Sequence, residues 1–298
     1  METAKNPTTT SEKKRASISE RAMLVTLNMG GWNYKVRNRK VASEVEQSKQ
    51  ARHGTCRVDT LLVSKEVLAK VEKIRGAART YLYGVSAPWR HGVRLVSSQI
   101  VFDVRDELRQ YKAKFMDAVE EFMDGYDAVL ADAPQRLKHL FNAKDFPSKE
   151  ALRSKFYFSV RMSAIPDAEH IMVKLSEEAI DEIRGEMLTE QKEALADAMS
   201  DVWKRIHTFV KHMSETLASD NNNFHTSLVG NVLDFAKSIP VLNFSGDEEL
   251  DQLKKEIEFR LTKFNSASAF RALKEDDALR SEAQREANNI AKKIGQYL

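Results

Sequence analysis

The sequence predicts a mainly α fold of long antiparallel helices, packed like a coiled coil, with a small β element. Three observations predict it. The 298 residues include only 11 Gly and 6 Pro, so few positions suit turns and helices are seldom interrupted. Apolar residues recur at three- and four-residue steps through much of the chain. Hydrophobic residues make up 42% and charged residues 31%, the balance of a folded globular protein.

The composition also excludes several classes of protein. A single cysteine, Cys56, excludes an internal disulfide framework and a cysteine-cluster zinc site. No run of about 18 apolar residues occurs, so we expect no membrane-spanning helix. No signal-peptide pattern opens the sequence. We therefore expect a soluble, cytoplasmic protein without a cofactor.

The first 40 residues predict a tail followed by two strands. Residues 1–20 contain almost no large apolar side chain, which is typical of a disordered, mildly basic tail. Residues 22–27 are apolar and predict a strand. Beyond a Gly-Gly pair, Trp32, Tyr34 and Val36 alternate with polar residues, which is strand periodicity. Because Gly favours turns, we expect a hairpin between these two strands.

The middle of the chain predicts helices and a second pair of strands. Ser64 suits the N-cap of a helix that ends near Gly84, and helical spacing of apolar residues continues later in the segment. The expected elements are a helix over 64–84, a loop over 86–92, a long helix over 99–131, short helices opened by Pro134 and by Ser148, and strands over 156–160 and 170–175.

The clearest element is a helix over residues 176–219, about 65 Å long at 1.5 Å per residue. A small domain cannot cover a helix of that length, so we expect part of it to pair with another helix and to make the protein a homo-oligomer. Three further helices are expected. The first covers residues 228–239 and ends at Pro240, the second follows a capping box formed by Ser245 and Glu248, and the third covers residues 276–296.

Charge divides the chain near residue 99. Residues 1–99 carry 19 Lys and Arg against 8 Asp and Glu, a net charge of +11, whereas residues 100–298 carry 28 against 36, a net charge of −8. This asymmetry favours a polyanion-facing region joined to an acidic body. Attraction between the two parts, within one chain or between subunits, explains it equally well. The expected segments are a tail over 1–20, a basic α+β region over 21–99, a helical body with a short β element over 100–175, and a long-helix region over 176–298.

Three stretches carry a family resemblance. They are LVTLNMGGWNYKVRNRKVASEV, YLYGVSAPWRHGVRL and SLVGNVLDFAKSIPVLNFSGDEELDQLKKEIEFRL. They combine a leading strand with a Trp, a Pro-Trp loop ending in an Arg, and a Leu-Asn-Phe link before an acidic helix. With them the sequence resembles an uncharacterised family of phage-encoded, mostly helical proteins. The resemblance implies a phage product made in the host cytoplasm during infection, and it implies no reaction.

Two clusters in the basic part mix aromatic rings with cations. Proteins that bind single-stranded nucleic acid stack rings on bases while cations follow the phosphates. We therefore expect the cations to neutralise phosphates and Trp32, Tyr34 and Trp89 to stack. The first cluster is Trp32, Tyr34, Lys35, Arg37, Arg39 and Lys40, and the second is Arg79, Tyr81, Tyr83, Trp89, Arg90 and Arg94.

The same residues also allow a purely structural interpretation. An amphipathic strand buries its aromatic face and exposes its cations, and Trp89 can pack its own loop against the body. His53 and Cys56 offer two metal ligands where zinc requires three or four, so we expect no metal site.

The sequence contains none of three common catalytic motifs, namely the glycine-rich phosphate-binding loop, the nucleophile elbow and the zinc-protease helix. We therefore expect a non-enzymatic protein that binds nucleic acid, DNA in the first instance, and oligomerises through its helices. The alternative is a protein–protein interaction factor: an inhibitor of a host enzyme, an adaptor for a phage ATPase, or an assembly subunit.

Overall fold

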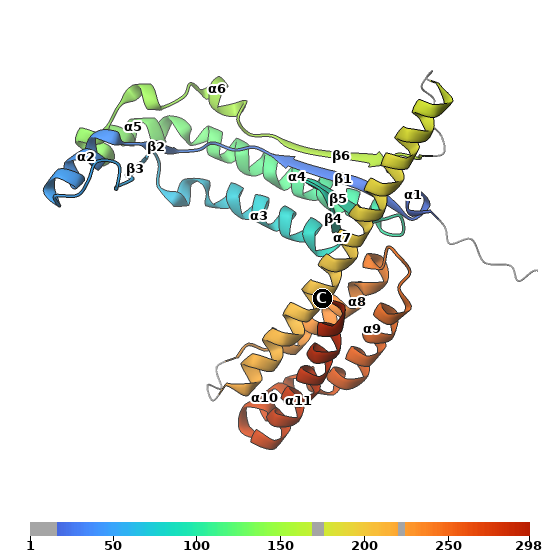
Figure 1. The fold of residues 1–298 in the computed structure, drawn as a ribbon. Helices are drawn as coiled ribbons and strands as arrows, with labels where there is room; N and C mark the ends of the chain where they lie inside the picture. The colour runs from blue at the N-terminus through green and yellow to red at the C-terminus, as the bar shows by residue number, and fades with distance from the viewer. Residues whose placement is uncertain (1–16, 169–175, 220–223) are drawn as a thin grey trace, which may run out of the picture. The chain divides into compact units, whose positions relative to one another are not determined.

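The computed structural model describes residues 17–168, 176–219 and 224–298. The chain is mainly α with a small antiparallel sheet, as predicted (Figure 1). Most of the predicted tail and the predicted strand over 170–175 lie outside the described residues. None of the described helices is both long enough and apolar enough to cross a lipid bilayer.

Contacts divide the chain into two compact units. Unit 1 comprises the residues up to Leu24, Leu95–Gln99 and Ala164–Leu298, and unit 2 comprises Val25–Arg94 and Ile100–Ser163. This grouping differs from the four expected segments, because residues on both sides of position 99 share the core of unit 2.

Within the described residues, six strands form two small sheets. The larger has the order β4-β5-β1-β6, and the smaller pairs β2 with β3 in antiparallel register, with Lys35 opposite Leu61 and Arg37 opposite Asp59. The strands are β1 (Ala22–Met29), β2 (Lys35–Arg37), β3 (Asp59–Leu61), β4 (Ala87–Arg90), β5 (Val93–Ser97) and β6 (Phe158–Ala164).

The strand predicted over 22–27 is confirmed, but the predicted hairpin is wrong. β1 lies between β5 and β6, and β2 pairs with β3 instead of β1. The reason lies at the Gly-Gly pair. The Gly30 amide donates to the Tyr157 carbonyl at 2.9 Å, so the chain runs on beside Tyr157 where a turn was expected.

The loop predicted over 86–92 is wrong as well. Its residues form β4 and a tight turn at His91 and Gly92 that leads into β5, and Gly92 has a φ of +75°. Pro88 is compatible with this strand because β4 is at the edge of the sheet, where a missing N–H breaks no ladder bond.

Unit 2 contains five of the helices. The helix predicted over 64–84 is confirmed from Ala69 onwards, with a 3₁₀ turn at Lys65–Leu68 before it, and the predicted cap is wrong because the Ser64 side chain makes no capping hydrogen bond. The long helix predicted over 99–131 is interrupted at Gly125, and Pro134 lies inside the next helix where a helix start was expected. Ser148 caps its helix as predicted. The helices are α2 (Arg39–Ser48), α3 (Ala69–Gly84), α4 (Val101–Asp124), α5 (Tyr126–Leu137) and α6 (Lys149–Arg153).

An aromatic core fills unit 2. The Trp32 ring centroid lies 6.2 Å from that of Phe122 and 5.9 Å from that of Tyr126, and Phe122 also packs on Phe156. Helices α3 and α4 run side by side (Figure 1), and their inward side chains pack with those of β1 and β6, such as Phe158.

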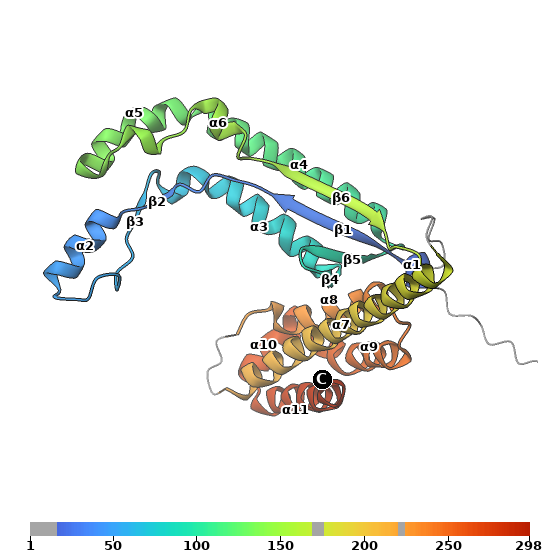
Figure 2. The ribbon, with the colours of Figure 1, turned by 45° about the horizontal axis from the view of Figure 1, so that its top comes forward.

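Unit 1 is built on α7 (Glu177–Ala218), which confirms the long helix, and the Ser176 side chain caps its N-terminus by accepting from the Ala179 amide. The second half of α7 packs on α8 and α11 of the same chain (Figure 2). The other helices of unit 1 are α1 (Ile18–Arg21), α8 (Ser227–Leu242), α9 (Glu248–Leu261), α10 (Ala267–Glu275) and α11 (Asp277–Ile294).

Several sequence predictions need correction in unit 1. Ile18–Arg21 is helical although it falls in the predicted tail. Pro240 lies inside α8 and does not end it. The N-cap of α9 is Asp247, whose carboxylate accepts from the Glu249 amide, in place of the predicted Ser245.

Replacing Gly30 by Ala should destabilise unit 2. A Cβ at this position would lie 2.6 Å from the Lys155 carbonyl oxygen and against the Tyr157 ring, so the backbone has to move. We expect Gly30→Ala to lower the free energy of unfolding by about 1–3 kcal/mol, measured by urea denaturation.

Gly76→Ala is the matched control, because a Cβ there meets nothing within 4 Å and Ala favours the helix by up to about 1 kcal/mol. Equal stability of Gly30→Ala and the wild type would show that the close approach of Tyr157 carries no constraint.

Candidate nucleic-acid interface

Unit 2 concentrates positive charge in its first part. Between residues 25 and 94 the sequence has 14 Lys and Arg against 5 Asp and Glu, whereas residues 100–163 have 11 of each. Unit 2 as a whole is therefore basic. Its positive residues come mainly from the segments that hold the two predicted clusters.

Four cations of the first cluster are exposed at one end of unit 2. We call Lys35, Arg37, Arg39 and Lys40 the β2–α2 cation row. Lys35 and Arg37 share the outward side of β2 while Val36 packs toward the core. Arg39 and Lys40 then open α2, whose N-cap Asn38 accepts from the Val41 amide at 3.0 Å.

The β2–α2 cation row has no ion-pair partner within the described ranges. Lys49 and Arg52 follow α2 and are also exposed without an ion-pair partner there. Neither residue belongs to the two clusters predicted from the sequence. Figure 1 shows α2, β2 and β3 together at the same end of unit 2, so six cations gather around one small β-ribbon and helix.

The rings of the first cluster are not available for stacking. Trp32 is 6% exposed and lies between Phe122 and Tyr126. Tyr34 is half-buried and meets Trp32 edge-on. The expectation that Trp32 stacks on bases is therefore wrong, because its apolar surface is used in the core, and the amphipathic-strand alternative holds for this ring.

Some residues of the second cluster are buried or hydrogen-bonded within the fold. Trp89 is 6% exposed, and its indole Nε1 is buried without a hydrogen-bond partner within the described residues, so its predicted stacking role is also wrong. Arg94 is half-buried and donates to the Ser86 hydroxyl at 3.0 Å and to the Ser86 carbonyl at 2.7 Å. Arg79 and Arg90 are exposed.

One ring of the second cluster does reach the surface. Tyr83 is 48% exposed, and the Arg94 guanidinium lies 4.5 Å from its ring centroid. Tyr81, by contrast, packs near Tyr111, and burial raises the pKa of its phenol.

The structure does not bring the two clusters together. β2 lies near the start of α3, and β4 and β5 lie near its end (Figure 1). The 16 residues of α3 span about 24 Å at 1.5 Å per residue. The exposed cations therefore form two separate surfaces, of which the β2–α2 cation row is the denser.

A buried carboxylate holds the loop that follows α2. Glu46 is 4% exposed. It accepts the amides of Gly54 and Cys56 at 2.9 Å each and contacts Nδ1 of His53 at 3.1 Å. The Cys56 amide, more than any other group, lowers the pKa of Glu46. The sequence indicates His53 and Cys56 as potential ligands but gives no sign of Glu46, whose carboxylate contacts the His53 ring and the Cys56 amide.

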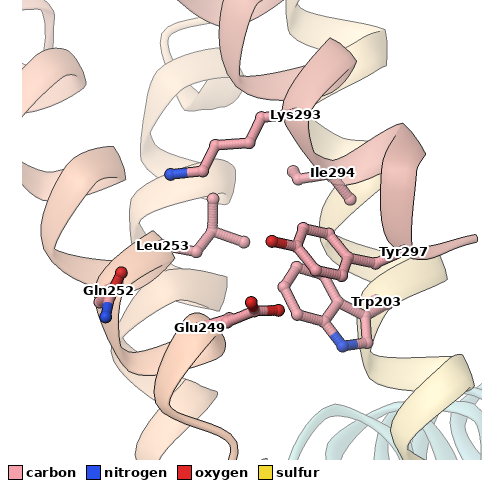
Figure 3. Close-up of a pocket in the computed structure, with 7 residues that line it drawn as sticks. All are labelled: Trp203, Glu249, Gln252, Leu253, Lys293, Ile294 and Tyr297. Carbon is pink, nitrogen blue, oxygen red and sulfur yellow. The ribbon is translucent and has the colours of Figure 1, made fainter.

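A small pocket in unit 1 offers no alternative site for an organic substrate. Trp203 and Tyr297 stack there with centroids 4.4 Å apart, beside Glu249 and Lys293 (Figure 3). Lys293 is bound to Glu256, and desolvation, together with a hydrogen bond to Glu249, raises the pKa of Tyr297. The cavity measures about 60 Å³, which suits a few water molecules.

Comparison with known proteins identifies one family. A family model described as "Protein of unknown function (DUF3150)" matches residues 20–219. No curated protein and no solved structure matches the chain.

Protonating Glu46 should loosen its loop. The pKa of Glu46 is lowered below 4.5 in the fold, so its contribution is complete above the unfolded value and is lost as the pH falls through the folded value. We expect the protection factors of the Gly54 and Cys56 amides, which correct for the intrinsic pH dependence of exchange, to fall in that acidic window in the wild type. Glu46→Gln keeps a neutral, weaker acceptor and should show reduced protection that does not change across the window.

Glu44→Gln on the exposed side of α2 is the matched control and should exchange like the wild type. Protection that stays unchanged in Glu46→Gln would contradict the role given to the carboxylate.

Proposed function

The chain belongs to the DUF3150 family of proteins of unknown function, and we propose that it binds the phosphate backbone of nucleic acid through the β2–α2 cation row. The observation that supports this function is the group of four exposed cations without carboxylate partners in the described structure. Lys49 and Arg52 extend the same surface. The binding is non-enzymatic, and DNA is the first nucleic acid to test.

The spacing of the row suits a chain of phosphates. Lys35 and Arg37 are two residues apart on a strand, which separates them by about 6.6 Å. Cations that neutralise phosphates release condensed counterions, and this release supplies most of the free energy of non-specific binding. An Arg also forms bidentate hydrogen bonds with a phosphate, which a Lys does not.

The burial of Trp32 and Trp89 determines whether the proposed binding reads the bases or only the phosphate backbone. Contacts to phosphates position a protein on nucleic acid, whereas contacts to bases specify sequence. With both indoles in the interior, the proposed contact is electrostatic and independent of sequence. In this proposal only Lys35, Arg37, Arg39 and Lys40 have the phosphate-binding role that the sequence predicted, and neither tryptophan stacks on bases.

A second candidate function rests on the first half of α7. No residue of α7 before Ala194 is buried, and Leu188 is 42% exposed. Residues 177–193 carry seven Asp and Glu against two Lys and Arg. Like charge opposes the pairing of two copies of this segment, so we infer a protein partner with a basic rim around an apolar centre.

Removing the cation row should weaken binding. The wild type should bind a DNA duplex with a log–log salt slope of about −3.6 or steeper, since each of the four phosphate contacts of the row contributes about −0.9 and Lys49 and Arg52 add to them. Changing all four cations of the row to Gln should make the slope shallower by about 3.6, measured by fluorescence anisotropy between low and physiological salt.

Lys73, Lys112, Lys192 and Lys204 changed together to Gln form the control, since they are exposed lysines elsewhere with the same loss of charge. Equal weakening in both variants would mean that net charge, and not this row, attracts the DNA. Absence of salt-dependent binding by the wild type would overturn the proposal.

The second candidate makes a separate prediction. Leu188→Glu adds charge to an exposed position and should remove a protein partner that co-purifies after nuclease treatment of the extract. Glu190→Gln, two residues away and exposed, should retain it. If Leu188→Glu retains the partner, this half of α7 is not its binding surface. If nuclease treatment alone removes the partner, nucleic acid and not α7 joins the two proteins.

The phage origin that the sequence resemblance implies stays a prediction.

A further inference from the structure

An apolar groove crosses unit 2 between α3 and α4. Val71, Ala118 and Phe122 lie in it, together with Val67 and Val129, and its volume is about 170 Å³. An apolar cavity of about 150 Å³ is large enough for benzene. The groove is therefore large enough for one aromatic side chain.

Gly125 keeps the groove open where α4 gives way to α5. Its φ of −82° and ψ of −6° are helical, so any residue can adopt this backbone. A Cβ there would meet only the carbonyl oxygens of Phe122 and Glu121, at 3.7 and 3.8 Å. A larger side chain is thus sterically permitted at a position that lines the groove.

One rim of the groove is acidic. Asp117, Glu121 and Asp124 follow one another at steps of four and three along α4, which places them on one edge of the helix. All three are exposed. Glu121 is paired with Lys70 across the groove, whereas Asp117 and Asp124 have no ion-pair partner within the described ranges.

Unit 1 carries an exposed aromatic side chain with a positively charged neighbour, which complements an apolar groove with an acidic rim. Phe259 on α9 is 88% exposed, more than any other large hydrophobic residue described. Lys255 lies four residues before it on the same face of the helix and is exposed without an ion-pair partner within the described ranges. Lys263, four residues after Phe259, is also exposed, and it is paired with Glu282 at 2.6 Å. A ring beside Lys255 therefore matches an apolar groove with an acidic rim.

We propose that Phe259 of one copy of this chain inserts into the α3–α4 groove of a second copy, with Lys255 against the acidic rim. The contact joins two different surfaces, so it is heterologous and extends into a ring or an open chain. This interface does not depend on the nucleic-acid proposal, and it uses neither the β2–α2 cation row nor the first half of α7.

Sedimentation velocity of the full chain tests the proposal. The wild type should gain mass as its concentration rises through the micromolar range, in the absence of nucleic acid. Phe259→Ala and Gly125→Leu should each weaken association about tenfold or more, because the ring or its groove is removed. Phe102→Ala is the control, since Phe102 is 64% exposed on α4 outside the groove.

A mixture of the two variants gives the most specific result. Phe259→Ala keeps its groove and Gly125→Leu keeps its ring, so together they should form one contact and stop at a 1:1 heterodimer. A circular dichroism spectrum and melting temperature equal to those of the wild type show that Gly125→Leu is folded, and Phe259→Ala provides an independent test at an exposed site.

Three results would overturn the proposal. The first is a wild type that remains a single chain at every concentration. The second is association that survives both variants, which would place the interface elsewhere, for example on α7. The third is a mixture that does not form the heterodimer although each variant is folded.

Discussion

Burial of the Trp32 indole against Phe122 and Tyr126 is the contact on which the arrangement of unit 2 depends. It ties the segment after β1 to α4 and α5 in a single aromatic core. Loss of a core Trp costs a protein about 3–5 kcal/mol. Because successive side chains of an extended segment point to opposite sides, the inward direction of Trp32, Tyr34 and Val36 also fixes the outward direction of Lys35 and Arg37.

The same constraint shapes the electrostatics. Cations held on the outer side of β2 and at the start of α2 stay in water, where they are not desolvated and need no carboxylate. Elsewhere in unit 2 exposed cations such as Lys70 and Arg153 are paired with acids of α4, whereas Lys73 and Lys112 have no ion-pair partner within the described ranges. The β2–α2 cation row differs from these in that four exposed cations lie within six residues of the chain. Glu46 supports this region from inside, since its buried carboxylate holds the loop that joins α2 to β3.

Local signals in the sequence were sufficient for the long helices and for β1. Helical spacing and the Ser148 cap are properties of neighbouring residues, and the structure confirms this cap and the long helix that follows Ser176. Strand pairing depends on residues far apart in the chain, so the true neighbours of β1 and β2 were not predictable. The Gly-Gly pair illustrates the difficulty, because its glycine is needed for the approach of Tyr157 and not for a turn.

The candidate site was predictable only in its cations. Alternation of rings and charges over residues 32–37 fits an exposed binding surface and a half-buried strand equally, and only the position of α4 decides between them. Glu46 gave no signal, because a Glu on a polar helix is usually exposed. Phe259 gave none either, since a single apolar residue among charges is common on protein surfaces.

The central claim is that the rings lie inside while the cations lie outside and bind. Acrylamide quenching of fluorescence in a chain that retains Trp32 alone, with Trp89→Phe and Trp203→Phe, tests it most directly. The account predicts weak quenching that does not change when DNA is added at low salt, although anisotropy shows that the DNA is bound. Strong quenching of the free protein, relieved by DNA, would place the indole at the interface and contradict the account.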